Sequence, residues 1–190
     1  MKKPRIVAFA GSTRSDSFNK KLIKHVAKAA EEAGAEVTLV DLRDYRMPLY
    51  DGDLEADSGL PEKAAELKVL LSEADALAIS SPEYNGSLSA VLKNSIDWLS
   101  RPGAVEGSVF AKKVGLIVSA SPGALGGLRG LVHLRSILTN LGVFVIPGQR
   151  AVGSAQTVFD ANGDWSDQGV RAQIESLAAE LVSVAGRLKG

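Results

Sequence analysis

The chain has 190 residues, 45% of them hydrophobic, so it can bury one sizeable core, and we expect a single domain over residues 1–190. Its 22 basic residues balance its 22 acidic residues, which argues against a general affinity for nucleic acid or for anionic membranes. With no cysteine and two histidines, it lacks the residues for a disulfide, a thiolate nucleophile or a zinc site, so no metal is expected. The first apolar run, Ile6 to Ala10, is shorter than a signal peptide core, and no run reaches ~18 apolar residues. We therefore expect a soluble, cytoplasmic protein.

Five short apolar runs alternate with longer stretches in which apolar residues recur at helical spacing. This alternation predicts repeated strand and helix units around a parallel sheet. The runs are rich in Val, Ile, Leu and Ala, as expected for strands that are covered on both faces. The predicted strands are Arg5 to Ala10, Glu36 to Asp41, Ala76 to Ser81, Val114 to Ala120, and Phe144 to Pro147.

The stretches after these runs predict five helices. Their apolar stripes extend over residues 22–33, 64–74, 88–99, 131–141 and 170–188. Pro61 suits the start of the second helix, and Gly142 suits the end of the fourth. Two stretches remain: residues 42–60 predict an ordered loop near the ligand, and residues 148–163 predict irregular structure.

Five strand and helix units are too few for an eight-stranded barrel. The pattern favours an open, doubly wound sheet in the order 2-1-3-4-5, with helices on both faces. In such a sheet, ligands bind beyond the carboxyl ends of the strands, where the strand order reverses. The loops after the first and third strands are therefore the candidate binding loops.

The loop after the first strand, Gly11 to Asn19, contains three serines, a threonine, an arginine and an asparagine just before a helix. A helix start offers unpaired N–H groups and a positive dipole end. To these, Ser12, Ser17 and Asn19 can add side-chain donors and Arg14 a positive charge. A phosphate monoester matches these donors, but a capped helix in a polar loop explains the same residues nearly as well. The glycines and lysine of a P-loop or a Rossmann fingerprint are missing.

The loop after the third strand reads Ser80 to Ser87 and leads into a helix with Lys93, Asn94, Asp97 and Trp98. Together with the first loop, its segment Pro82-Glu83-Tyr84-Asn85-Gly86-Ser87 resembles the NAD(P)H-dependent FMN reductases, a family that includes chromate, quinone and azo-dye reductases. The similarity continues through residues 119–135 and covers most of the chain up to about Arg150.

The resemblance implies a flavodoxin-like three-layer α/β/α sandwich with bound FMN and NADPH or NADH as co-substrate. It assigns the FMN phosphate to the first loop, the isoalloxazine edge to the second, and one further contact to the start of a third. The residues carried over are Ser12, Arg14, Ser17, Phe18, Asn19, Pro82, Glu83, Tyr84, Asn85, Gly86 and Ser121. In chromate reductase relatives, the position after Asn85 is often aromatic, whereas this chain has Gly86. The pocket shape and the assembly contacts are therefore expected to differ from those of these relatives at this position.

No side chain is predicted to act as a catalytic acid or base, because hydride chemistry on a flavin needs none. His133 and Trp98 are read as packing or interface residues, and His25 as a surface helix residue. Tyr84 either covers part of the flavin ring or packs on a neighbouring loop. Arg129 and Arg135 either join an intersubunit ion-pair network, as in relatives, or lie on an exposed helix face.

The predicted function is an oxidoreductase that passes hydride from NAD(P)H through FMN to a small acceptor such as a quinone, azo dye, chromate or free flavin. Relatives are dimers or tetramers, so a homodimer or homotetramer is expected. A non-enzymatic electron carrier of the flavodoxin type is the alternative, although its phosphate loop and acidic surface would differ. A flavin-free phospholigand sensor remains the third possibility. A serine hydrolase is disfavoured because no Gly-x-Ser-x-Gly elbow is present.

Overall fold

Five parallel strands form the centre of the structure, a computed structural model that describes residues 3–188. The strand order is β2 (Glu36–Asp41), β1 (Arg5–Ala10), β3 (Ala76–Ser80), β6 (Val114–Ala120) and β7 (Phe144–Val145). Every pairing along this path is parallel. Renumbered by main strands, this is the predicted 2-1-3-4-5 order, and the flavodoxin-like α/β prediction is confirmed.

The fifth position of the sheet is shared by two short strands, which corrects the prediction of one strand from Phe144 to Pro147. β7 pairs with the start of β6, and β8 (Arg150–Val152) pairs with its end. Ile146 still donates its N–H to the carbonyl of Gly115, but Pro147 has no N–H with which to continue the ladder. Part of the stretch expected to be irregular therefore returns to the sheet.

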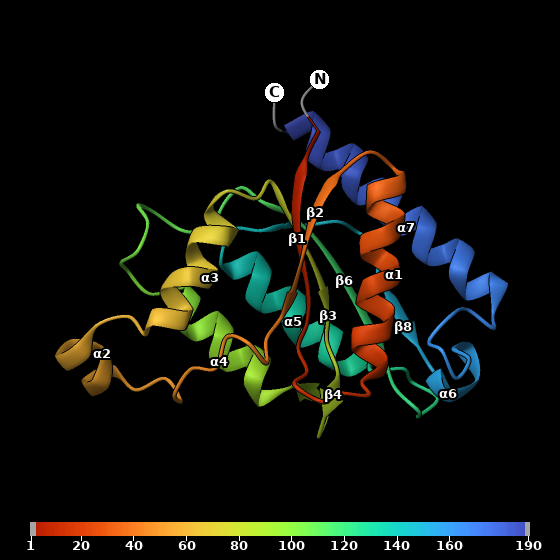
Figure 1. The fold of residues 1–190 in the computed structure, drawn as a ribbon, viewed down its shortest axis with the longest axis horizontal. Coiled ribbons are helices and arrows are strands. Elements are labelled where there is room, and N and C mark those ends of the chain that lie inside the picture. Colours follow the sequence, from red (N-terminus) through yellow and green to blue (C-terminus); the bar gives the residue numbers. More distant parts are fainter. Residues whose placement is uncertain (1–2, 189–190) are drawn as a thin grey trace.

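Helices cover both faces of the sheet, as Figure 1 shows, and the three central strands β1, β3 and β6 are apolar and buried on both sides. In β1, Ile6, Ala8 and Ala10 enter one core, and Val7 and Phe9 enter the other. The first core lies under α1 (Phe18–Glu32) and α7 (Gln168–Leu188). The second lies under α3 (Glu62–Ser72), α4 (Ala90–Leu99) and α5 (Leu128–Asn140).

The segment 42–60, expected to be an ordered loop, contains the short helix α2 (Gly52–Ser58). α4 holds this segment, because Asn94 and the indole of Trp98 both donate to the carbonyl of Pro48 at 2.8 Å. Tyr50 stacks edge-on against Trp98, which is fully buried. Trp98 is thus a core residue, as expected. Another short helix, α6 (Ala155–Val158), also lies in a stretch predicted to be irregular.

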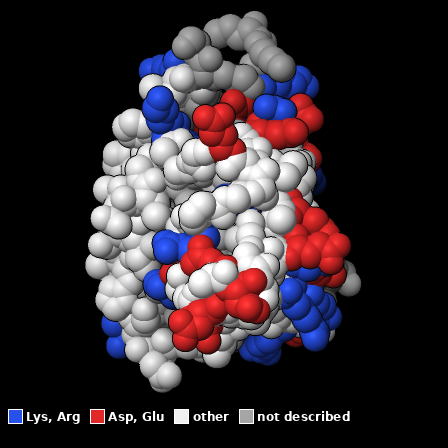
Figure 2. All heavy atoms as spheres, turned by 90° about the vertical axis from the view of Figure 1, so that its left-hand side faces the viewer, with Lys and Arg blue, Asp and Glu red and all other residues white. Residues whose placement is uncertain are grey.

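Charged side chains of both signs are mixed on the surface that carries α2 and α3, and a broad uncharged area borders them (Figure 2). This mixture agrees with the net charge of zero. Over residues 3–188, no helix has the length and hydropathy needed to span a membrane.

Candidate flavin-binding site

The carboxyl ends of three neighbouring strands meet at one edge of the sheet, and backbone hydrogen bonds hold their loops together. The bonds run from the N–H of Gly11 to Ser80, from Ser81 to Val118, and from Ser121 to Val152, at 2.9, 2.9 and 3.0 Å. The hydroxyl of Ser89 also donates to the carbonyl of Gly11 at 2.6 Å. The loops after β1, β3 and β6 therefore converge, as the strand order requires.

Asn19 fixes the start of α1 against this edge. Its side-chain oxygen accepts from the hydroxyl of Ser80 and from the N–H of Ala120, and its amide nitrogen donates to the carbonyl of Ala120. These distances are 2.9, 3.0 and 2.8 Å, and Asn19 is only 3% exposed. The side chain is buried and bonded to two strands, so its main role within the protein is to hold the start of α1 in place.

The first turn of α1 combines the two interpretations that the sequence left open. Ser17 is the N-cap and accepts a long hydrogen bond of 3.4 Å from the N–H of Lys20, so the helix is capped. The N–H groups of Phe18 and Asn19 still lack partners within the helix, as helix geometry requires. Ser12, in the loop that precedes this turn, is buried, and its hydroxyl accepts from the N–H of Arg14 at 3.3 Å. Capping and an anion site are therefore compatible here.

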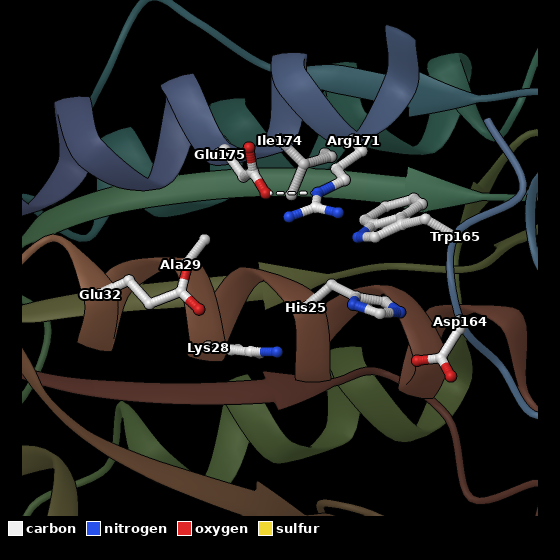
Figure 3. A pocket seen from close by; sticks show the side chains of 9 residues that line it. All are labelled: His25, Lys28, Ala29, Glu32, Asp164, Trp165, Arg171, Ile174 and Glu175. Atoms are coloured by element: carbon white, nitrogen blue, oxygen red, sulfur yellow. Dashed lines mark hydrogen bonds and ion pairs between the residues drawn. The ribbon is translucent and has the colours of Figure 1, made fainter. Parts of the chain in front are cut away.

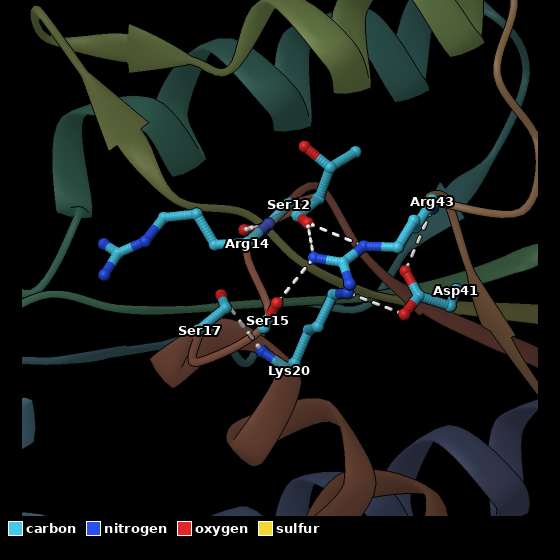
Figure 4. A network of polar contacts seen from close by, with 8 residues as sticks. Ser12, Arg14, Ser15, Ser17, Lys20, Asp41 and Arg43 are labelled. Carbon is cyan, nitrogen blue, oxygen red and sulfur yellow. Dashed lines mark hydrogen bonds and ion pairs between the residues drawn. The ribbon is translucent and has the colours of Figure 1, made fainter.

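Two basic residues that the sequence analysis missed lie beside this loop (Figure 4). Arg43, just after β2, binds the loop, and the Lys20 ammonium lies 2.6 Å from the Asp41 carboxylate. Burial would raise the pKa of Asp41, but hydrogen bonds from Lys20 and Arg43 outweigh it, so this pKa lies below its ordinary value. The side chain of Arg14 is exposed and extends away from Arg43. The predicted 2-1 strand adjacency was the signal that could have placed Arg43 here.

The loop after β3, which was predicted only as a loop, is a β-hairpin formed by β4 (Glu83–Tyr84) and β5 (Ser87–Leu88). Asn85 and Gly86 are its two turn residues and have φ angles of 51° and 78°. Positive φ at both positions matches the Asn-Gly hairpin turn. An added Cβ on Gly86 would meet no described atom within 4 Å, so the protein itself requires this glycine for its backbone angle and not for close packing.

Glu83 joins the hairpin to α5. Its carboxylate accepts from the Nε of Arg129 at 2.7 Å and from the N–H groups of Arg129 and Gly130 at 3.0 and 3.2 Å. Burial would raise the pKa of Glu83, but these donors outweigh it and hold the pKa below its ordinary value. Both arginines make bonds within the subunit. Arg129 is exposed on α5, as one of the two interpretations expected, and pairs with Glu83. Arg135 is half-buried and donates to Gln149 and to carbonyls of residues 145–147.

The other predicted contacts lie around the same edge with different exposure. Pro82 is buried and Ser121 is half-buried, its hydroxyl accepting from the N–H of Gly123 at 3.2 Å. Tyr84 and Asn85 are exposed at the hairpin tip. A hollow of about 700 Å³ opens beside Tyr84, and the ring of His133 on α5 contacts the Ser87 hydroxyl at 2.9 Å.

His25 is not a simple surface residue, contrary to the sequence-based interpretation. Its ring lies 4.3 Å from the ring of Trp165 and 5.9 Å from that of Phe159, and its Nε2 contacts the carbonyl of Gly163 at 2.8 Å. The hollow that it lines, about 210 Å³ in volume, lies between α1 and α7 (Figure 3). These contacts of His25 hold the segment after α6 against α1.

Among residues 3–188, no three His, Cys, Asp or Glu side chains lie together as a metal site would require. The candidate site is thus a set of backbone and hydroxyl donors, with basic side chains beside them, at the switch point of a flavodoxin-like sheet. That arrangement defines the class of protein: a flavodoxin-like α/β protein with a candidate anion site at its switch point.

The sequence profile of the NADPH-dependent FMN reductase family matches residues 4–157, and the chain belongs to this family. It is 34% identical over 187 residues to an NAD(P)H-dependent FMN reductase of Pseudomonas aeruginosa, covering 98% of this chain and 97% of that protein. It is 35% identical over 186 residues to a quinone reductase of Escherichia coli K12, covering 95% and 93%. The solved structure of FerB, a flavoenzyme NAD(P)H:(acceptor) oxidoreductase from Paracoccus denitrificans, superposes with a TM-score of 0.83 at 26% identity, covering 97% and 98%. The predicted family and the predicted oxidoreductase activity are confirmed.

Proposed function

We propose that this chain binds FMN at the converging loops and uses it to reduce small acceptors with NADH or NADPH. The phosphate would lie at the start of α1, and the ring would lie along the loops after β3 and β6. The acceptors would be quinones, azo dyes, chromate or free flavin. The observation that carries the proposal is the convergence of these three loops at the switch point, held by Asn19 and by backbone hydrogen bonds.

The residues present fit a phosphate ester. The N–H groups of Phe18 and Asn19 point out of the helix start, and the Ser12 hydroxyl, which already accepts from Arg14, keeps its own hydrogen for donation. The exposed Arg14 guanidinium adds a charge that a dianion would attract. When bound, FMN would supply the ring that accepts hydride and passes it on.

The other proposed contacts would orient the ring and leave one face open to replaceable substrates. Pro82 and Ser121 are held at the strand ends, and Tyr84 is 51% exposed at the hairpin tip, where it could cover an aromatic ring. Glu83 acts indirectly, because its carboxylate is committed to α5. No side chain is assigned as a proton donor, since His133 and Glu83 are both engaged within the protein.

The direct test is to add FMN to purified protein and follow binding by calorimetry and by the flavin absorbance spectrum. We expect binding, with bleaching of the flavin band when NADH or NADPH is then added. A protein that binds no FMN would refute the proposal. The electron-carrier alternative is separated by stopped-flow mixing, because a carrier would be reduced negligibly by free NAD(P)H.

The proposal extends to assembly and location. Exposed apolar side chains gather on and before α5, where Leu125, Leu128 and Val132 are 55%, 43% and 59% exposed, with Tyr84 on the neighbouring hairpin. Exposed apolar side chains at this spacing fit a homodimer or homotetramer. Light scattering of the FMN-loaded protein checks this, and a monomeric mass would refute it. We place this single domain, residues 1–190, in the cytoplasm, where NAD(P)H is available.

A further inference from the structure

Arg43 contacts the first loop in a way that neither helix capping nor charge alone requires. Its Nε and Nη2 both donate to the carbonyl of Thr13, at 3.1 and 2.6 Å, and Nη2 also donates to the hydroxyl of Ser15 at 2.8 Å. Arg43 is exposed, so its side chain is not part of the core. These contacts join the end of β2 to a loop thirty positions earlier in the chain.

The backbone of Arg43 is itself held in place. Its backbone N–H donates to one carboxylate oxygen of Asp41 at 3.0 Å, while the other oxygen binds the ammonium of Lys20 on α1 at 2.6 Å. Figure 4 shows this chain of contacts running from Lys20 through Asp41 and Arg43 to the loop. The backbone of Arg43 is therefore bonded to Asp41 at the end of β2 and, through Asp41, connected to Lys20 in the first turn of α1.

In the peptide bond between Thr13 and Arg14, the C=O of Thr13 and the N–H of Arg14 point in opposite directions, because a trans peptide is planar. Arg43 binds its carbonyl oxygen, and the Ser12 hydroxyl accepts its N–H at 3.3 Å on the other side. With this N–H as its donor, the Ser12 hydroxyl is set to donate its own hydrogen outward. If the peptide turned over, a carbonyl oxygen would face the anion site and repel a phosphate.

We infer that Arg43 is a positioning residue for the anion site: it fixes the peptide between Thr13 and Arg14 so that its donor side, relayed by Ser12, faces the ligand. The inference rests on the proposed function, since it assigns the flavin phosphate as that ligand. It requires the two parallel donors of a guanidinium and not merely a positive charge. The affinity contributed by the flavin ring and the ribityl chain should not depend on Arg43.

The test compares FMN with riboflavin, which has the same ring without the phosphate, by fluorescence titration of three variants. Arg43→Ala should weaken FMN binding about tenfold. Arg43→Lys, which keeps the charge but has no planar fork, should weaken it several-fold. Riboflavin affinity should stay unchanged in both. Arg46→Ala, which removes an exposed charge from the same segment, is the matched control and should leave both affinities unchanged.

A second readout needs no cofactor. Hydrogen exchange of the backbone amides of residues 13–16 in cofactor-free protein should become faster in Arg43→Ala and Arg43→Lys, but not in Arg46→Ala. The inference fails, while the proposed function stands, if wild type binds FMN and Arg43→Lys binds it with the same affinity, since a positive charge would then suffice. It also fails if FMN and riboflavin affinities fall together, which would indicate a general structural defect. If wild type binds neither flavin, the proposed function fails and this inference fails with it.

Discussion

The two loops that flank the candidate site are held in opposite ways. The first loop is fixed by buried polar side chains, with Asn19 bonded to two strands and Ser12 and Ser17 buried beside it. The hairpin after β3 is anchored at its base through Glu83, while Tyr84 and Asn85 stand exposed at its tip. A site that keeps one resident group and exchanges others benefits from this division, because only the resident group needs a prebuilt cradle.

The largest effect is expected at the rigid loop. Asn19→Ala would leave the backbone groups of Ala120 and the hydroxyl of Ser80 buried without partners, lowering the free energy of unfolding by about 3 kcal/mol. Urea denaturation measures this. Lys24→Ala, at an exposed position of the same helix, should change stability by less than about 0.5 kcal/mol. A loss below about 1 kcal/mol for Asn19→Ala would show that the first loop is not prebuilt by this side chain.

The base of the hairpin should respond next. Glu83→Gln keeps the shape but removes the charge that pairs with Arg129 and the start of α5, at a cost of about 1.5 kcal/mol near neutral pH. Because the folded-state pKa of Glu83 is lowered, its contribution is complete above the ordinary value of 4.5 and is lost as the pH falls through the folded-state value.

Urea denaturation of wild type and Glu83→Gln at pH 7 and in acid measures that difference, which should shrink in acid. Glu66→Gln, from an exposed pair with Lys63, should cost no more than about 0.5 kcal/mol at either pH. A difference that grows on acidification would contradict the assigned role of Glu83.

At the turn, the expected effect is smaller. Gly86→Ala forces a side chain into positive φ and should cost about 1 kcal/mol, with no clash to add to it. Gly186→Ala makes the same chemical change inside α7, where the added methyl meets nothing within 4 Å, and should instead stabilise by up to about 1 kcal/mol. Thermal unfolding of the two variants should therefore shift in opposite directions. A shift in the same direction would mean that backbone angle is not what Gly86 supplies.

The smallest effect on stability is expected at the tip. Tyr84→Ala removes a side chain that is 51% exposed and should change the free energy of unfolding by less than about 0.5 kcal/mol. The KM for a quinone acceptor should nevertheless change, while Tyr84→Phe, which keeps the ring, should behave like wild type. A large loss of stability in Tyr84→Ala would show that the tip is as tightly packed as the first loop.

The fold was predictable because each strand is a short apolar run between helical stripes, and the strand order then placed the binding loops. β8 was missed because a three-residue strand follows Pro147 and Gly148, which read as the end of a strand. The hairpin was missed although Asn85-Gly86 is a known turn pair, because its strands have two residues each. Contacts between distant positions carry no local signal, as with His25 and Trp165 or Arg43 and Thr13.

The bonds from Asn19 to Ala120 cross 101 positions of the chain. During synthesis, the helix that would receive the phosphate is complete long before β6 has been made. The donors at its start therefore cannot reach their final geometry until roughly two thirds of the chain has left the ribosome. FMN should therefore bind only late in the folding of the nascent protein, and adding FMN should not change the rate of the earliest folding steps.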